Sequence, residues 1–359
     1  MPYTRLLSHV MLVAVLVGCT AGLGNRKPRQ GDTVADRVNV VLVDDEAVAA
    51  LDILQKRYKS QPVSEADWEK LFRSEGYRRL KERESYMQRA FTDSAFREFI
   101  LSDTLVRRTP LLSSTLAAMQ RVDVSNAARR ALAYLPANAR IAARLYPEIK
   151  PRTNSFVFSL DSIPGIFIYV DPSQTRAVFE NTLAHELHHI GLGASCSSAT
   201  DSGLAEPMRT LLRRMGGFGE GFAMLAAAGS ADTNAHAESD SATRARWDRD
   251  VAAHETHLRE LERFFLDVAE DRIASADSVA QVAMTFYGEQ GPWYSVGWQM
   301  AVTIEKVFGR DRLIGVMCDP RALLSTYNEA ARTWNRMHRD QLALWSDELL
   351  SRLGARRLK

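Results

Sequence analysis

The sequence predicts a mainly helical α+β protein in which a small β-hairpin or sheet precedes one central helix. Apolar residues recur at helical spacing over most of residues 46–146 and again from Thr243 to the C-terminus. Between these regions, residues 155–160 and 165–170 are rich in aromatic and β-branched residues, which is typical of strands. The third observation is a helical pattern from Phe179 to Gly191 that contains the sequence His-Glu-Leu-His-His.

The N-terminal residues have the pattern of a bacterial lipoprotein signal peptide. Arg5 precedes the apolar stretch Leu6–Val17, which is too short to cross a bilayer core of about 30 Å as a helix. The sequence Leu16-Val17-Gly18-Cys19 resembles a lipobox, so Cys19 is the expected lipidated residue. An aspartate directly after Cys19 would favour retention in the inner membrane. The residue there is Thr20, so sorting to the outer membrane is expected. A plain secreted protein that loses Cys19 with its signal peptide stays open.

Four regions follow from composition and periodicity. They are a signal peptide at 1–18, a polar tether at 19–37, an essentially all-helical N-terminal region at 38–146, and a domain at 147–359 that contains the candidate catalytic and metal-binding residues. Within the third region, residues 38–43 are predicted as a short strand, and Ser64-Glu65-Ala66-Asp67 resembles a helix capping box. This region has no evident chemistry. It is expected to cover the catalytic domain, to line a substrate groove, or to inhibit the enzyme until it moves. The sequence does not distinguish between these roles.

The next predicted element is a β-hairpin. Ser155–Leu160 and Gly165–Val170 are connected through Asp161-Ser162-Ile163-Pro164, which has the residue types of a turn. The hairpin would bring the chain directly to the central helix.

His185, Glu186 and His189 form an H-E-x-x-H pattern on that helix. Residues four apart lie on one face, so both imidazoles can bind one metal ion, while Glu186, about 100° further round, reaches a metal-bound water. Glu180-Asn181-Thr182 offers capping residue types at the helix start, and Gly191-Leu192-Gly193 predicts its end. The competing interpretation is a surface helix with scattered histidines.

Zinc requires a third protein ligand, and three acidic residues follow within about forty residues: Asp201, Glu206 and Glu220. Glu220 is favoured because glycines on both sides let its backbone approach the first helix, and the apolar run 222–228 would bury a second helix behind the metal. Glu206 precedes Pro207, where an acid is equally explained as a favourable charge at a helix start.

The chain resembles an uncharacterised bacterial family of zinc-dependent peptidases of the gluzincin kind, in which two histidines and a glutamate bind zinc. Five segments between about residues 60 and 330 carry the resemblance: 149–156, 167–172, 180–189, 220–223 and 294–298. The resemblance implies a helical zincin-like catalytic domain, Zn²⁺ as the cofactor and no settled substrate. It also implies that the strand before the metal helix lies at a sheet edge, where an extended peptide can add as a further strand. Packing in the protein core is an equally good explanation for the apolar residues of this strand.

Metal-assisted hydrolysis is the mechanism that this resemblance implies, with Glu186 taking a proton from water and passing it to the leaving amine. Tyr294, Tyr287, His254 and His257 are candidate donors to the oxyanion, and Tyr294 is favoured because it begins the family-like Tyr-x-x-Gly segment. A core tyrosine is equally compatible. His254 lies in an apolar stripe of one long helix over 247–268, where a core histidine is the competing interpretation.

Three further predictions concern histidines and cysteines. His188 is expected to make packing or solvent contacts, and His236, in the polar loop Gly229–Ser241, is expected to be exposed. Cys196 and Cys318 are equally consistent with a disulfide and with two buried thiols.

The 359 residues include 46% hydrophobic and 25% charged residues with a net charge of +2, which gives no bias toward nucleic acid or an anionic membrane. We therefore expect a zinc metallopeptidase that acts on peptides or proteins in the bacterial cell envelope, contacts the membrane only through its lipid, and has no organic cofactor. Two alternatives stay open: a zinc-dependent hydrolase of other amides, and a non-catalytic binding lipoprotein with a structural zinc. The sequence does not indicate an oligomeric state.

Overall fold

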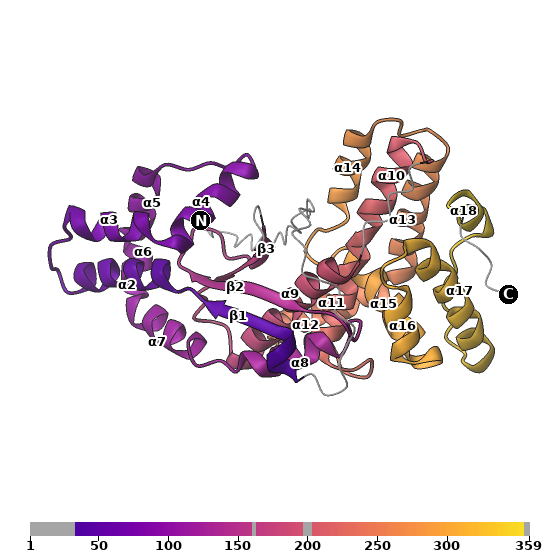
Figure 1. The fold of residues 1–359 in the computed structure, drawn as a ribbon, viewed down its shortest axis with the longest axis horizontal. Helices are drawn as coiled ribbons and strands as arrows, with labels where there is room; N and C mark the ends of the chain where they lie inside the picture. The colour runs from indigo at the N-terminus through magenta and orange to yellow at the C-terminus, as the bar shows by residue number, and fades with distance from the viewer. Residues whose placement is uncertain (1–32, 160–162, 197–202, 355–359) are drawn as a thin grey trace.

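The computed structural model describes residues 33–159, 163–196 and 203–354, which form two groups of helices on either side of a small sheet and a set of central helices (Figure 1). The prediction of a mainly helical α+β protein is confirmed. Cys19, the predicted signal peptide and most of the tether lie outside the described residues. Within the described ranges, no helix combines the length and the apolar character needed to cross a membrane.

The described residues of the first half form eight helices and the four strands of the sheet. In order they are α1 (Val34–Arg37), β1 (Val38–Leu42), α2 (Asp45–Tyr58), α3 (Glu65–Arg73), α4 (Glu75–Tyr86), α5 (Asp93–Ile100), α6 (Asp103–Arg107), α7 (Thr109–Met119), α8 (Val124–Leu132), β2 (Ile141–Glu148), β3 (Phe156–Phe158) and β4 (Gly165–Tyr169).

The second half is helical throughout its described elements. They are α9 (Arg176–Ser195), α10 (Glu206–Arg214), the 3₁₀ turn η1 (Met215–Phe218), α11 (Gly219–Ala228), α12 (Ser241–Ala252), α13 (His254–Ala269), α14 (Ala276–Thr285), α15 (Pro292–Phe308), α16 (Arg310–Val316), α17 (Pro320–Met337) and α18 (Asp347–Arg352).

The strands have the order β1-β2-β4-β3, with β1, β2 and β4 parallel and β3 antiparallel to β4. The pairing of Phe156 with Phe167 confirms the predicted hairpin. The expectation that the strand before the metal helix lies at the edge is wrong, because β4 lies between β2 and β3 and all its residues are buried. The edge strand on this side is β3.

Strand β2 is the largest difference from the predicted elements. Residues 141–146 were expected to continue the helical region, but they begin a strand that pairs with both β1 and β4. Ile141, Ala143 and Leu145 are buried while Ala142 and Arg144 are partly exposed, which is the period of two of a strand. Alanine, leucine and arginine favour helices locally, so the pairing with two neighbours overrides propensity here.

Other predictions for the N-terminal region are confirmed. Strand β1 lies within the expected range 38–43. Ser64 caps α3, since its hydroxyl accepts a hydrogen bond from the amide of Asp67 and the Asp67 carboxylate accepts one from the amide of Ser64. The predicted domain boundary at residue 146 falls inside β2, so the sheet contains strands from both sides of it; the division into domains stays a prediction.

Two apolar cores lie at the two ends of the molecule. The first is formed by α2–α9 and the sheet and includes Ile53, Ile166 and Leu183. The second is formed by α10–α18 and includes Phe218 and Trp345. Helix α9 belongs to the first core and most of α11 to the second, so these two helices lie where the cores meet (Figure 1).

Candidate metal centre

Helix α9 positions three of the predicted site residues. It begins earlier than expected, because the hydroxyl of Thr175 accepts a hydrogen bond from the amide of Val178 and caps the first turn. It also continues through the predicted stop at 191–193 to Ser195. Gly191 is needed for packing rather than for termination, since a Cβ atom there would lie 2.2 Å from Cδ1 of Leu135.

Helix α11 brings Glu220 to α9. Gly221, the next residue, allows close contact with α15, because a Cβ atom at this position would lie 2.0 Å from the backbone nitrogen of Trp298 and 2.6 Å from Cα of Gly297. Helix α8 is fastened to both metal helices, since Arg130 donates hydrogen bonds to the Asn181 side chain and to the carbonyl of Ala227. The site therefore lies on helices that are braced from two sides.

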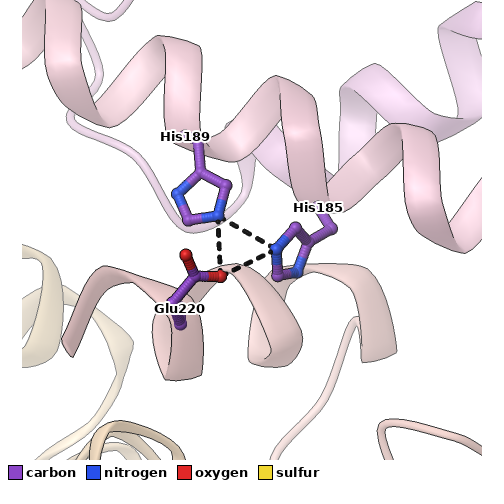
Figure 2. Close-up of side chains that lie close together, drawn as sticks. All are labelled: His185, His189 and Glu220. Carbon is purple, nitrogen blue, oxygen red and sulfur yellow. Dashed lines mark hydrogen bonds and ion pairs between the residues drawn. The ribbon is translucent and has the colours of Figure 1, made fainter. Parts of the chain in front are cut away.

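The side chains of His185, His189 and Glu220 converge (Figure 2). Nε2 of each histidine lies 3.2 Å from Oε2 of Glu220, and the two Nε2 atoms are 2.9 Å apart. His185 and Glu220 are almost fully buried, while the side chain of His189 is 15% exposed. The structure thus brings together the three predicted metal ligands from two helices.

These three atoms fit the requirements of a zinc ion. In a tetrahedral site with bonds of about 2.0–2.2 Å, neighbouring ligand atoms lie roughly 3.3 Å apart, close to the spacing found here. Imidazole nitrogen and carboxylate oxygen are also the donors of catalytic zinc sites. Among the described residues, no further histidine, cysteine or carboxylate joins the cluster. Oε1 of Glu220 has no hydrogen-bond partner within the described part of the chain, so this oxygen is available to bind a metal ion.

Glu186 is buried directly beside the cluster. Its Oε1 has no hydrogen-bond partner among the described residues. The pKa of Glu186 is raised to about 7: burial is the main cause, His189 lowers the pKa, and the charge of Glu220 raises it. A buried carboxyl whose pKa lies near neutrality can both accept and return a proton.

Two tyrosines lie near Glu220. The Tyr294 hydroxyl, on the first turn of α15, hydrogen-bonds to the Glu220 carboxylate, and burial raises the pKa of this phenol well above its ordinary value. Tyr287 is close enough for the charge of Glu220 to raise its pKa as well, although burial is again the main cause. The predicted role of Tyr294 as an oxyanion donor stays a prediction, while its contact with Glu220 was not anticipated.

His254 lies in a different setting from the predicted one. The expected long helix over 247–268 is wrong, since it is broken at Ala253 into α12 and α13. His254 begins α13, is partly exposed, and its Nδ1 contacts the carbonyl oxygen of Val251 at 2.9 Å. His257 contacts the hydroxyl of Ser295 at 2.7 Å. No described contact connects His254 to the cluster, and its catalytic role stays a prediction.

Of the two further histidine predictions, one is confirmed and one is wrong. His188 is fully buried and its Nε2 lies 3.2 Å from the carbonyl oxygen of Tyr134, which agrees with a packing role. His236 was expected to be exposed, but it is partly buried against Trp247 and contacts Gln290. The polar composition of its loop concealed this contact, and nothing in the sequence singled out Gln290.

The other acidic candidates do not join the site. Glu206 is at the surface in ion pairs with Arg209 and Arg213, and Asp201 lies outside the described residues. Cys196 and Cys318 form a disulfide, which resolves the alternative that the sequence left open. This bond connects the end of α9 to the segment between α16 and α17.

A family model described as "Putative zinc dependent peptidase (DUF5700)" matches residues 68–336. The matched range contains His185, Glu186, His189, Glu220 and Tyr294. No curated protein and no solved structure matches the chain.

Proposed function

The chain belongs to the DUF5700 family, and from this premise we propose that it is a zinc-dependent peptidase with His185, His189 and Glu220 as the metal ligands and Glu186 as the general base. One observation carries the proposal: three zinc-type ligand atoms from two helices lie within 4.8 Å of one another, beside a buried carboxyl that no described residue engages at Oε1. The substrate would be a peptide or protein.

The ligand set favours catalysis over a structural zinc clasp. A structural site has four protein ligands, whereas a catalytic site has three and keeps a position for water or substrate. The cluster offers three among the described residues, and His189 retains some exposure. This arrangement supports the peptidase over the non-catalytic binding protein.

The residues of the chain have distinct roles in the proposed reaction. When bound, zinc supplies Lewis acidity, which polarises a carbonyl group and lowers the pKa of water toward neutrality. Glu186 removes a proton from the attacking water and delivers it to the nitrogen of the leaving amine, so the peptide bond is exchanged for a carboxyl group and an amine. Its burial excludes bulk water and keeps its pKa in the range where both transfers are feasible.

Tyr294 has a supporting role in this scheme. Its hydroxyl orients the Glu220 carboxylate, as outer groups around a metal commonly orient its ligands. Stabilisation of the developing oxyanion, the role expected from the sequence, would require the single O–H of this phenol to leave Glu220. The role of His254 stays a prediction: its Nδ1 contacts the Val251 carbonyl, and its Nε2 has no hydrogen-bond partner among the described residues.

Metal removal tests the function directly. We expect one zinc per chain after purification, cleavage of a peptide library that is lost when a chelator removes the metal, and cleavage that returns with added Zn²⁺. The Glu220→Ala variant should bind zinc more weakly by at least about 100-fold, because it lacks a ligand. Glu206→Ala, the matched control at an exposed glutamate, should bind zinc as the wild type does. Full zinc binding without cleavage of any peptide would favour a structural site.

We further propose that the chain is anchored in the bacterial cell envelope, in the outer membrane, by a lipid on Cys19. The proposal rests on the lipobox-like sequence Leu16-Val17-Gly18-Cys19 after a short apolar stretch. Mass spectrometry of the membrane fraction should find a diacylglyceryl-modified cysteine at the mature N-terminus, and Cys19→Ala should leave the membrane fraction. A mature N-terminus beyond Cys19 would contradict the anchor.

A further inference from the structure

Gln290 adopts a backbone conformation that favours glycine. Its φ is +75°, in the left-handed region, and it lies in the short turn Gly288-Glu289-Gln290-Gly291 between α14 and α15. A residue with a Cβ atom is strained in this region, and such strain persists where the surroundings hold the residue in place. At Gln290 a side-chain contact holds the residue in this conformation.

That contact is made with His236. Nε2 of the Gln290 amide lies 2.5 Å from Nε2 of the imidazole, and Nδ1 of the same ring lies 2.9 Å from the hydroxyl of Ser239. A carboxamide nitrogen only donates, so Nε2 of His236 accepts and its Nδ1–H donates to Ser239. Burial and the charge of Arg246 lower the pKa of His236 to about 4, which keeps the ring neutral and able to accept at neutral pH.

The contact connects the segment after α11 to the segment before α15. His236 is on loop 229–240, which directly follows α11, the helix of Glu220. Gln290 lies two residues before the start of α15, the helix of Tyr294. Two ion pairs lie close by: Lys306 of α15 with Asp232 of the same loop at 2.8 Å, and Arg246 of α12 with Glu289 of the turn at 3.1 Å.

The turn around Gln290 also sets the start of α15. The amide of Tyr294 donates a hydrogen bond to the carbonyl of Gly291 at 2.9 Å, and the amide of Gly291 donates to the carbonyl of Tyr287 at 2.7 Å. Tyr287 and Tyr294 both interact electrostatically with Glu220. A shift of this turn would therefore move both phenols relative to the third ligand.

We propose that Gln290 is a positioning residue of the metal centre: its side-chain contact with His236 fixes the start of α15 so that Tyr294 supports Glu220. This inference rests on the proposed function and deepens it, since it assigns to a residue outside the H-E-x-x-H pattern a role in zinc binding. Gln290 acts through Tyr294 and contacts neither metal nor substrate.

A Gln290→Gly variant separates this role from a purely structural one. Glycine removes the amide and relieves the left-handed backbone, so the melting temperature of the metal-free protein should stay the same or rise. Zinc affinity, measured by competition with a chromophoric chelator, should nevertheless fall by about tenfold, the effect expected for loss of an outer-shell partner. Catalytic activity is not needed for this measurement.

Gln88 provides a matched control. It is also a glutamine with positive φ, at +55°, but its side chain is exposed. Gln88→Gly should likewise keep or raise the melting temperature, and it should leave zinc affinity unchanged. Weaker zinc binding by both variants would show that the loss comes from glycine itself and would overturn the inference.

A double-mutant cycle with Tyr294→Phe tests whether Gln290 acts through this tyrosine. Tyr294→Phe alone should weaken zinc binding, and adding Gln290→Gly should cause little further loss, because the phenol that Gln290 positions is already absent. Additive losses, or unchanged affinity in Gln290→Gly, would overturn the positioning role and leave the proposed function intact. Failure of the wild-type protein to bind zinc would overturn the proposed function, and this inference with it.

Discussion

At the scale of single residues, His185 and His189 of α9 and Glu220 of α11 form the metal centre's cluster of side chains. The spacing of His185 and His189 fixes their common helix face. The glycines beside Glu220 were expected to allow a close approach to α9, but the close approach at Gly221 is to α15, and Gly219 makes only ordinary contact with α9. The partners of His236 and the hydrogen bond between Tyr294 and Glu220 depend on residues far apart in sequence. No local pattern encodes them, so the sequence alone could not predict them.

Two buried carboxyls outside the metal site make a residue-scale prediction about pH. Glu46 and Glu148 are fully buried, and neither oxygen of Glu148 has a hydrogen-bond partner among the described residues. Burial raises the pKa of both, the charge of Glu46 raises the pKa of Glu148 further, and Lys150 lowers both. The folded protein thus binds a proton above the ordinary value of 4.5, and this contribution to stability is lost as the pH rises through the folded-state pKa.

Glu148→Gln should therefore flatten the dependence of stability on pH. Between about pH 5 and pH 9, the melting temperature of the wild type should fall more steeply than that of the variant, because the neutral amide has no proton to lose. Glu69→Gln, at an exposed position, serves as the control and should follow the wild type. Parallel curves for wild type and Glu148→Gln would contradict a raised pKa at this position.

At the scale of elements, packing rather than propensity decides the differences between prediction and structure. Strand β2 contains helix-forming residues but is held between β1 and β4, and α9 passes the predicted glycine stop because Gly191 packs against Leu135. Elements with strong local signals, such as the hairpin of β3 and β4 and the cap at Ser64, form as expected. Elements with weaker signals take their form from neighbours that are distant in sequence.

The contact between α11 and α15 gives an element-scale prediction. Gly221→Ala would place a Cβ atom 2.0 Å from the Trp298 nitrogen, so the two helices would have to separate. We expect a loss of about 3 kcal/mol or more in the free energy of unfolding, measured by urea denaturation, together with weaker zinc binding. Gly216→Ala, where no atom lies within 4 Å of the new methyl group, should change neither property. Wild-type stability in Gly221→Ala would show that the helices do not require this close approach.

At the scale of the whole molecule, the metal centre lies between two apolar cores that are fastened to each other. Tyr134, which follows α8 and packs into the second core, contacts the Glu305 carboxylate at 3.1 Å and accepts a hydrogen bond from Arg310 at 2.9 Å. The disulfide between Cys196 and Cys318 adds a covalent connection across 122 residues. A site built from α9 and α11 therefore depends on how the two groups of helices are held together.

Removal of the disulfide should lower global stability. The Cys196→Ser/Cys318→Ser variant is expected to lose about 2–5 kcal/mol in the free energy of unfolding, as is usual for a bond that closes a long loop. Urea denaturation with and without a reducing agent provides the control, since reduction should destabilise the wild type and leave the double variant unchanged. Equal stability of the wild type under both conditions would contradict a disulfide in the folded protein.

The central claim is that Glu186 performs proton transfer at a zinc site formed by His185, His189 and Glu220. The most direct test is the rate of peptide hydrolysis by zinc-loaded Glu186→Gln, with bound zinc measured in the same sample. Glutamine cannot accept the proton, so the rate should fall by roughly 100- to 10,000-fold. Because residue 186 is not one of the proposed zinc ligands, one zinc per chain should be retained. Hydrolysis at the wild-type rate with zinc retained would contradict the assignment of Glu186 as the general base.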